Sequence, residues 1–299
     1  MRKYHLFLVA AAIAFCSCGN ERDENPDLPE TPDLPEIPVL PETPELEVEV
    51  LEYRPAPGQF INENFEVQTM AEANAYAEKR FKSKLYVSLG SFGGYIMVKM
   101  PKEIKNQKGY DFAIIGNSFS NSSEPGIVWV SEDTNGNGSA DDAWYELTGS
   151  DEAKRNYSVT YHRPAEAGNI PWEDNQGESG VIEYLPQYHK QMYYPNWIKE
   201  DSYTLTGSML EHRTILDEES GKWKNQDFGE GYADNWGTDL AVDKNNTYYN
   251  QFDLDKAIDK DGKKVTLKSV HFVKVQSAIL KNAGWLGEVS TEVCGFKIF

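Results

Sequence analysis

One short segment has oxygen-bearing side chains at the spacing of a calcium-binding loop. Counted from Asp133, such side chains stand at positions 1, 3, 5 and 9, with glycine at position 6. Ca2+ prefers hard oxygen ligands, and glycine permits the sharp turn that brings them together. Trp144 takes position 12, where an EF-hand has a bidentate Glu, so Asp141, Asp142 or a distant carboxylate must complete the shell. The expected structural Ca2+ ligands are Asp133, Asn135, Asn137, Ser139, Asp141 and Asp142. The alternative is an empty Asn-Gly hairpin turn, which the same residues favour.

A second stretch, residues 172–236, is dense in aromatic rings. It holds ten Trp or Tyr in 65 positions, with Asn, Gln and Asp between them. Rings beside amides on long loops suit a large, flat, uncharged ligand with hydrogen-bonding groups at its rim, either a corrinoid or a sugar chain. The competing interpretation is that many of these rings fill the core. The expected ligand-binding residues are Trp172, Asn175, Tyr193, Tyr194, Asn196, Trp197, Trp223, Gln226, Asp234 and Trp236. We place Trp129 in the core and leave Trp285 unassigned.

The sequence offers little catalytic machinery. It contains no HExxH, GxSxG or P-loop motif, and its histidines are scattered without a second ligand at metal spacing. Pairs of acidic residues, such as Glu218 with Glu219, occur by chance in a chain this acidic. We therefore expect a binding protein and not an enzyme, with a glycoside hydrolase or esterase left as an alternative.

Charge and composition limit the partners. The 299 residues include 48 acidic and 29 basic side chains, a net charge of −19 that disfavours nucleic acid because polyphosphate binding depends on Lys and Arg. Cations, neutral ligands and proteins remain as partners.

The first 18 residues read as an export signal. Arg2 and Lys3 precede an apolar stretch of secretory length, which is too short for a stable membrane span. Cys18 follows a small residue and precedes Gly19, which resembles the lipobox of bacterial lipoproteins and implies a lipid on Cys18. The remaining cysteine of a mature chain is Cys294, so no internal disulfide is expected.

Residues 19–52 are predicted to form an acidic tether. Seven of the 15 prolines recur there at every third position, the period of a polyproline II helix. Twelve acidic residues and one arginine stand in the same segment, and their repulsion extends it. The acidic cluster after Cys18 is similar to the surface-export signal of Bacteroidetes lipoproteins, which implies a lipid-anchored protein on the outer membrane that faces the cell exterior.

Residues 53–299 are predicted to fold as an all-β domain. Short β-branched or aromatic runs are separated by Gly, Asn, Asp and Pro, as in a jelly-roll-like antiparallel β-sandwich. One short helix is expected over 70–81, because Thr69 and Glu72 have capping-box spacing and apolar residues follow at helical intervals. Strands are expected at 86–89, 95–100, 112–116, 127–131, 144–147, 158–161, 202–206, 265–267 and 272–275.

Several of these segments carry a resemblance to known proteins. The stretches 88–98, 110–119 and 252–255 look like strand motifs of jelly-roll ligand-binding modules. The sequence SSEPGIVWVSEDTNGNG at 122–138 and DAWYELTGS at 142–150 resemble BtuH-like surface lipoproteins of Bacteroidetes, and 53–60, 194–198, 231–235 and 284–292 extend the match. The resemblance implies that the chain binds cobalamin (vitamin B12) or a related corrinoid and passes it to an outer-membrane transporter complex. A glycan-binding surface module is the alternative.

Overall fold

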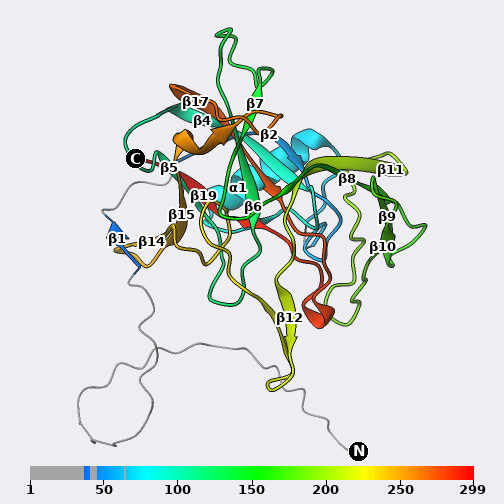
Figure 1. Ribbon diagram of the computed structural model, residues 1–299. Helices are drawn as coiled ribbons and strands as arrows, with labels where there is room; N and C mark the ends of the chain where they lie inside the picture. Colours follow the sequence, from blue (N-terminus) through cyan, green and yellow to red (C-terminus); the bar gives the residue numbers. More distant parts are fainter. Residues whose placement is uncertain (1–36, 41–45, 64) are drawn as a thin grey trace, which may run out of the picture. The chain divides into compact units, whose positions relative to one another are not determined.

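The computed structural model describes residues 37–40, 46–63 and 65–299 (Figure 1). Two antiparallel sheets and a smaller third one enclose the main core, so the prediction of an all-β sandwich is confirmed. Sheet I contains β16 (Ala257–Ile258), β7 (Trp144–Leu147), β6 (Gly126–Ser131), β17 (Ser269–Ser277), β4 (Tyr95–Lys105) and β2 (Glu49–Arg54), in that order.

Sheet II faces sheet I across the core. Its order is β1 (Val39–Leu40), β14 (Leu240–Asp243), β15 (Tyr248–Phe252), β5 (Phe112–Ile115) and β19 (Gly295–Ile298), with β1 parallel to β14 and the other pairs antiparallel. Alternate residues of β4 and β17, such as Val98 and Val273, meet Phe112 and Phe296 of sheet II in one buried cluster. Each such side chain contributes about 1.5–3 kcal/mol when it leaves water, so this interface holds the two sheets together.

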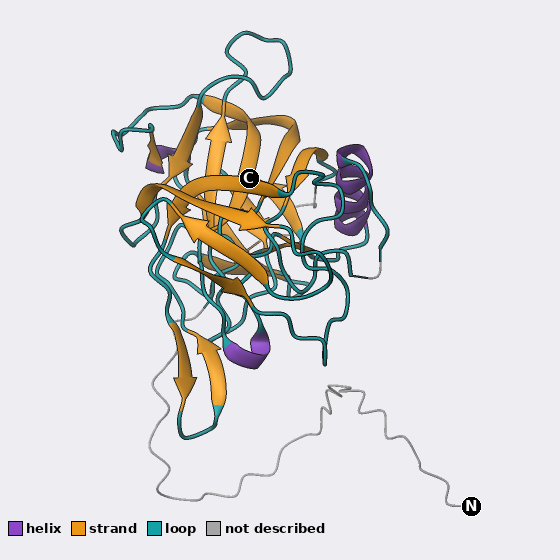
Figure 2. Ribbon diagram, turned by 90° about the vertical axis from the view of Figure 1, so that its right-hand side faces the viewer, coloured by secondary structure: helices purple, strands orange, loops and turns teal. Residues whose placement is uncertain are grey.

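Sheet III, a short strand pair, a hairpin and two 3-10 turns accompany the two main sheets. Sheet III contains β10 (Ser179–Ile182), β9 (Ile170–Asp174), β8 (Lys154–His162) and β11 (Ser202–Met209), and its Val159 and Leu205 join the main core. The short pair is β18 (Glu292–Val293) with β3 (Val87–Ser88), the hairpin is β12 (Thr214–Asp217) with β13 (Lys222–Asn225), and the 3-10 turns are η1 (Leu254–Lys256) and η2 (Gly284–Leu286). The hairpin projects from the body, and η2 lies beside its base (Figures 1 and 2).

Helix α1 (Met70–Lys82) begins and ends close to the predicted bounds. Thr69 and Glu72 form the expected capping box, in which each side chain accepts a hydrogen bond from the other residue's backbone N–H. Ala73, Ala77 and Phe81 lie on one face and are buried against the core, as the spacing predicted. None of the helices in the described ranges has the length and hydropathy needed to cross a bilayer.

Some predictions differ from the structure. Residues 265–267 do not form a strand. The chain there connects β16 to β17 and makes isolated backbone contacts, such as the hydrogen bond from the Val265 N–H to the Ala257 carbonyl (2.9 Å). Folded structure also begins before residue 53: β2 starts at Glu49, the Leu46 N–H bonds to Phe296, and β1 lies inside the segment assigned to the tether. Cys18, the export signal and most of the tether lie outside the described residues.

Trp129 is half-buried and packs against a second, smaller core cluster that includes Ile127, Phe228 and Tyr232. It points away from the sheet I–sheet II interface, and the Lys274 ammonium lies 4.6 Å from its ring centroid. Burial lowers the pKa of Lys274 to about 8. Trp129 therefore belongs to a cation–π cluster on the outer face of sheet I.

Candidate functional site

Three of the predicted ligand-binding rings are part of the core. Tyr193 and Tyr194 are fully buried and Trp197 is 5% exposed. Their polar atoms are also engaged: the Trp197 indole N–H donates to the Tyr53 carbonyl (3.1 Å), and the Tyr194 hydroxyl donates to the Glu200 carbonyl (2.8 Å). These rings fix the long 183–201 segment to the body and present no surface to a ligand.

Asp234 is also fully buried and connects three segments of backbone. One carboxylate oxygen accepts the N–H groups of Asn117 and Ser118 (both 2.9 Å), and the other accepts that of Glu292 (2.8 Å). All its contacts are internal, in contrast to the prediction that it meets a ligand. Burial nonetheless raises the pKa of Asp234 to about 7.

The predicted amide residues are dispersed. The Asn175 side chain bonds to backbone atoms of Asn156 and Ser158 and so anchors the β9–β10 turn. Asn196 is half-buried, and its N–H donates to the Asn62 side chain. Gln226 is exposed just after β13. The structure does not gather these amides around one ligand position.

Trp236 forms a separate aromatic pair. Its ring centroid lies 5.1 Å from that of Tyr248, which is 38% exposed, and its backbone N–H donates to the Ser123 hydroxyl. This pair lines none of the hollows described below.

The two remaining tryptophans of the predicted binding set, Trp172 and Trp223, approach the same segment, residues 280–285. Trp172 of β9 lies beside Leu280, and Asn282 donates to the Val181 carbonyl of β10 (2.9 Å). Trp223 of β13 packs directly on Gly284, so closely that no other residue type fits there. The structure therefore brings Trp172 and Trp223 to the same segment of the chain.

Two shallow hollows flank Trp172 and Leu280, and we call them together the Trp172 groove. The smaller has a volume of about 100 Å3, and the larger has about 280 Å3. Their shared walls are Trp172 and Leu280. The smaller is lined further by Val181, Ile182, Lys281 and Asn282, and the larger by Lys154, Tyr157, Asp174, Glu178, Met209, Leu210, Glu211 and His212.

Trp285, which the sequence alone does not assign, stands on the same loop at 280–285. It is 49% exposed on η2, between Gly284 and Gly287, which both have positive φ (56° and 87°). Leu216, directly across the hairpin from Trp223, is 48% exposed. The sequence feature that could have indicated an exposed Trp285 is its pair of flanking glycines, because glycine adopts the positive φ of a short turn that places a large ring toward solvent.

Polar atoms beside the groove lack hydrogen-bond partners within the described structure. They are Nδ1 of His212 and Oδ1 of Asn282. Burial, followed by the charge of Lys281, lowers the pKa of His212, so its imidazole is neutral at physiological pH. A buried polar atom without a partner marks a place where water or a ligand group is stabilising.

The predicted calcium loop connects β6 to β7 and holds itself together by internal bonds. Asp133 accepts the Gly138 N–H (3.0 Å), and the Asp141 carboxylate accepts the side-chain amides of Asn135 (3.2 Å) and Asn137 (2.9 Å). Asp142 accepts the Thr134 N–H, and Ser139 donates its own N–H to Asn137. Oδ1 of Asp133 is buried without a partner. In the described ranges, no group of three or more His, Cys, Asp or Glu is arranged around a metal position.

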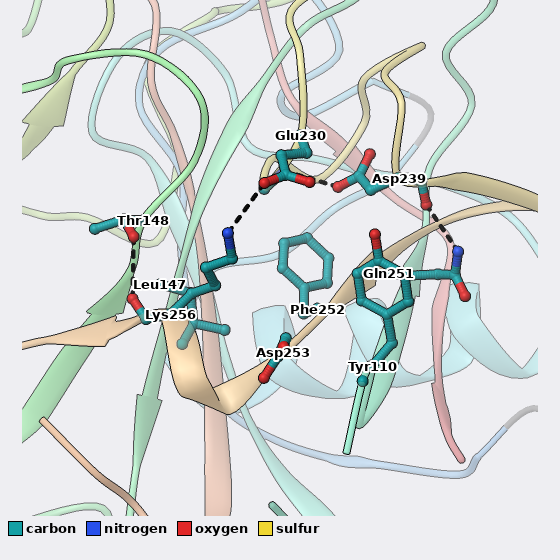
Figure 3. Close-up of a pocket in the computed structure, with 11 residues that line it drawn as sticks. Tyr110, Leu147, Thr148, Glu230, Asp239, Gln251, Phe252, Asp253 and Lys256 are labelled. Carbon is teal, nitrogen blue, oxygen red and sulfur yellow. Dashed lines mark hydrogen bonds and ion pairs between the residues drawn. The ribbon is translucent and has the colours of Figure 1, made fainter. Parts of the chain in front are cut away.

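A further concavity, not predicted from the sequence, lies beside β15 and η1 (Figure 3). We call it the Tyr110 pocket, and its volume is about 140 Å3. Tyr110, Leu147 and Phe252 supply its apolar surface, and the polar side chains are Thr148, Glu230, Asp239, Gln251, Asp253 and Lys256. Its residues come from five separate stretches of sequence, so no local motif announces it.

The chain matches no protein-family model, and a search of curated proteins finds no match either. The choice between the two concavities and their ligands therefore depends on their geometry.

Proposed function

We propose that the protein is a cell-surface lipoprotein that binds cobalamin or a related corrinoid and passes it to an outer-membrane transporter complex. The observation that carries this proposal is the convergence of Trp172, Trp223 and Trp285 on the loop at 280–285. Two of these rings were expected from the sequence to bind ligand. The third, Trp285, is half-exposed on this loop.

The chemistry of this surface suits a corrinoid. Indole rings and aliphatic side chains provide a dispersion surface for a large, flat, uncharged ring, and half-exposed rings lose little rotamer freedom on binding. The hollows are open to solvent and small, so a large ligand would lie across them instead of entering one. His212 and Asn282 supply polar atoms at the edge for peripheral amides.

The Trp223→Ala and Trp285→Ala variants test the proposal. Each removes an indole ring that lies on or against the loop at 280–285, next to the residues that line the Trp172 groove. We expect cyanocobalamin affinity to fall about tenfold for each variant, on the usual scale of a binding hot spot. Isothermal titration calorimetry measures this directly. Tyr188→Ala is the matched control, because Tyr188 is 59% exposed and lines neither hollow.

The titration also separates the alternatives. If the wild-type protein gives no heat with cyanocobalamin at tens of micromolar and binds a glycan on an array instead, the same rings stack on sugar faces. If the protein hydrolyses a glycoside or an ester, and substitution of one carboxylate or serine abolishes this activity, the hydrolase alternative replaces both binding functions.

Anchoring completes the proposal. A lipid on Cys18 and the acidic proline-rich segment would hold the domain at the outer surface, within reach of a transporter.

We also propose that the loop at 133–142 binds a structural Ca2+. Its donor set of carboxylates and amides fits a hard cation, and the unpartnered Asp133 oxygen is a position where a cation would be stabilising. Asn135 and Asn137 would turn their oxygens, instead of their N–H groups, toward the ion.

Calcium should therefore stabilise the fold. At about 100 times the dissociation constant, the expected gain is about 2.7 kcal/mol, or roughly 5–10 °C in melting temperature. Differential scanning fluorimetry with Ca2+ and with EDTA measures it, and Asp133→Ala should abolish the difference. An equal melting temperature under both conditions would identify the loop as a plain turn.

A further inference from the structure

The Tyr110 pocket carries excess negative charge. Glu230, Asp239 and Asp253 line it, and among the described lining residues the cation is Lys256. Lys256 is paired with Glu230 at 3.1 Å, which leaves the charges of Asp239 and Asp253 without a partner of opposite sign in the pocket. The pKa of the Tyr110 hydroxyl is raised by burial and then by the charges of these three carboxylates.

The polar lining consists mainly of hydrogen-bond acceptors. Gln251 already donates its side-chain N–H to the Asp239 carbonyl (3.1 Å), and the Thr148 hydroxyl donates to the Lys256 carbonyl (3.1 Å). The carboxylate of Asp239 accepts from the Gly231 N–H (2.7 Å) and the Asn250 amide (3.1 Å), which hold it in place. A hydroxyl-rich ligand needs donors as well as acceptors, whereas an ammonium group offers donors alone.

The remaining walls are apolar. The Tyr110 ring, 39% exposed, stands at the pocket beside the buried Phe252 ring and Leu147 (Figure 3). Aromatic faces attract cations through their quadrupole, and aliphatic carbon packs well on them. With about 30 Å3 for each water-sized group, 140 Å3 holds four or five heavy atoms.

We propose that the Tyr110 pocket binds a primary alkylammonium group: the ammonium meets the carboxylates that line the pocket, and its short carbon chain lies against Tyr110 and Phe252. The site is separate from the Trp172 groove, so this inference is independent of the corrinoid proposal. A free aliphatic amine and a lysine side chain of a partner protein share this chemistry.

Calorimetric or NMR titration of the full folded domain with n-butylammonium tests the site, with n-butanol as its neutral isostere. We expect n-butanol to bind at least about tenfold more weakly, because it lacks the charge. Tyr110→Ala and Asp253→Asn should each weaken n-butylammonium binding about three- to tenfold, and added salt should weaken it further. Tyr188→Ala again serves as the control, and unchanged melting temperatures show that the variants fold.

Two more ligands separate the possible sources. If Nα-acetyl-lysine methylamide binds as tightly as 1,4-diaminobutane, the result favours a lysine of a partner protein. If the diamine binds clearly more tightly, the result favours a free amine. Either result supports the site. Equal affinity for n-butanol and n-butylammonium would overturn the proposal. So would no binding at about 20 mM ligand, or binding that neither substitution changes.

Discussion

The Asp234→Ala variant should lose about 4 kcal/mol of unfolding free energy, the largest effect we expect from a single substitution in this chain. Asp234 is fully buried, and its carboxylate accepts three backbone N–H groups, from Asn117, Ser118 and Glu292. Alanine would leave these three donors without partners, and each unsatisfied buried donor costs about 1–3 kcal/mol. Part of this loss is offset, because the variant no longer has to bury an acidic side chain. Urea unfolding monitored by tryptophan fluorescence measures the difference.

Two companion variants make this test specific. Asp234→Asn keeps an oxygen for Asn117 and Ser118 but places an N–H group toward Glu292, so its cost should be intermediate. Asp217→Ala removes a carboxylate that also accepts backbone N–H groups, from Glu219 and Ser220, but in an exposed turn, where water replaces it. We expect this variant to lose less than about 1 kcal/mol. An equally small loss of unfolding free energy for Asp234→Ala would show that the hydrogen bonds to Asp234 do not hold these segments together.

The features that the sequence predicted well are those with local physical causes. Helix α1 follows from a capping box and a helical apolar period within 13 residues. Strands such as β7, at 144–147, follow from β-branched and aromatic runs bounded by turn residues. The failure at 265–267 has the same origin: Val265 and Leu267 satisfy the strand pattern, but the neighbouring strand β16 has two residues and forms only isolated contacts with this segment.

The site was harder to predict because the direction of a ring on a long loop is set by distant contacts. Trp197 and Trp223 both stand in the ring-dense stretch, yet Trp197 is held inward by the Tyr53 carbonyl and Trp223 rests on Gly284 at the surface. Asp234 looked like a polar loop residue, and its partners are more than 50 residues away in sequence. The Tyr110 pocket depends on chain topology in the same way.

A group of buried carboxyls beside the C-terminal segment should make the fold less stable as pH rises. Glu288 is 2% exposed; one of its oxygens accepts the Gln59 N–H (2.9 Å) and the other has no partner in the described structure. Burial raises the pKa of Glu288 to about 8. Burial and the nearby Glu292 and Asp234 raise the pKa of Glu124 as well. A buried carboxyl with few donors around it is stable only when protonated.

The direction of the pH effect follows from these pKa values. Below about pH 4.5 Glu288 is protonated in both the folded and the unfolded chain, so it imposes no penalty. Between about pH 4.5 and 8 the unfolded chain releases this proton while the folded chain retains it, and unfolding becomes progressively easier. The loss is complete above pH 8 and amounts to roughly 5 kcal/mol for this one group.

Glu288→Gln isolates this contribution, because glutamine keeps an oxygen for the Gln59 N–H and cannot ionise. Urea unfolding at pH 5 should give similar stabilities for the variant and the wild type, whereas at pH 8.5 the variant should be more stable by roughly 2–4 kcal/mol. Glu219→Gln, at the exposed tip of the β12–β13 hairpin, should change neither value. If the difference in stability between the variant and the wild type is the same at pH 8.5 as at pH 5, Glu288 is ionised in the fold and has a cationic partner.

Glu288 follows Gly287 at the end of η2, so its protonation also bears on the loop that carries Trp285. A parallel loss of ligand affinity at high pH in the wild type, but not in Glu288→Gln, would show that this buried proton helps to position the Trp172 groove.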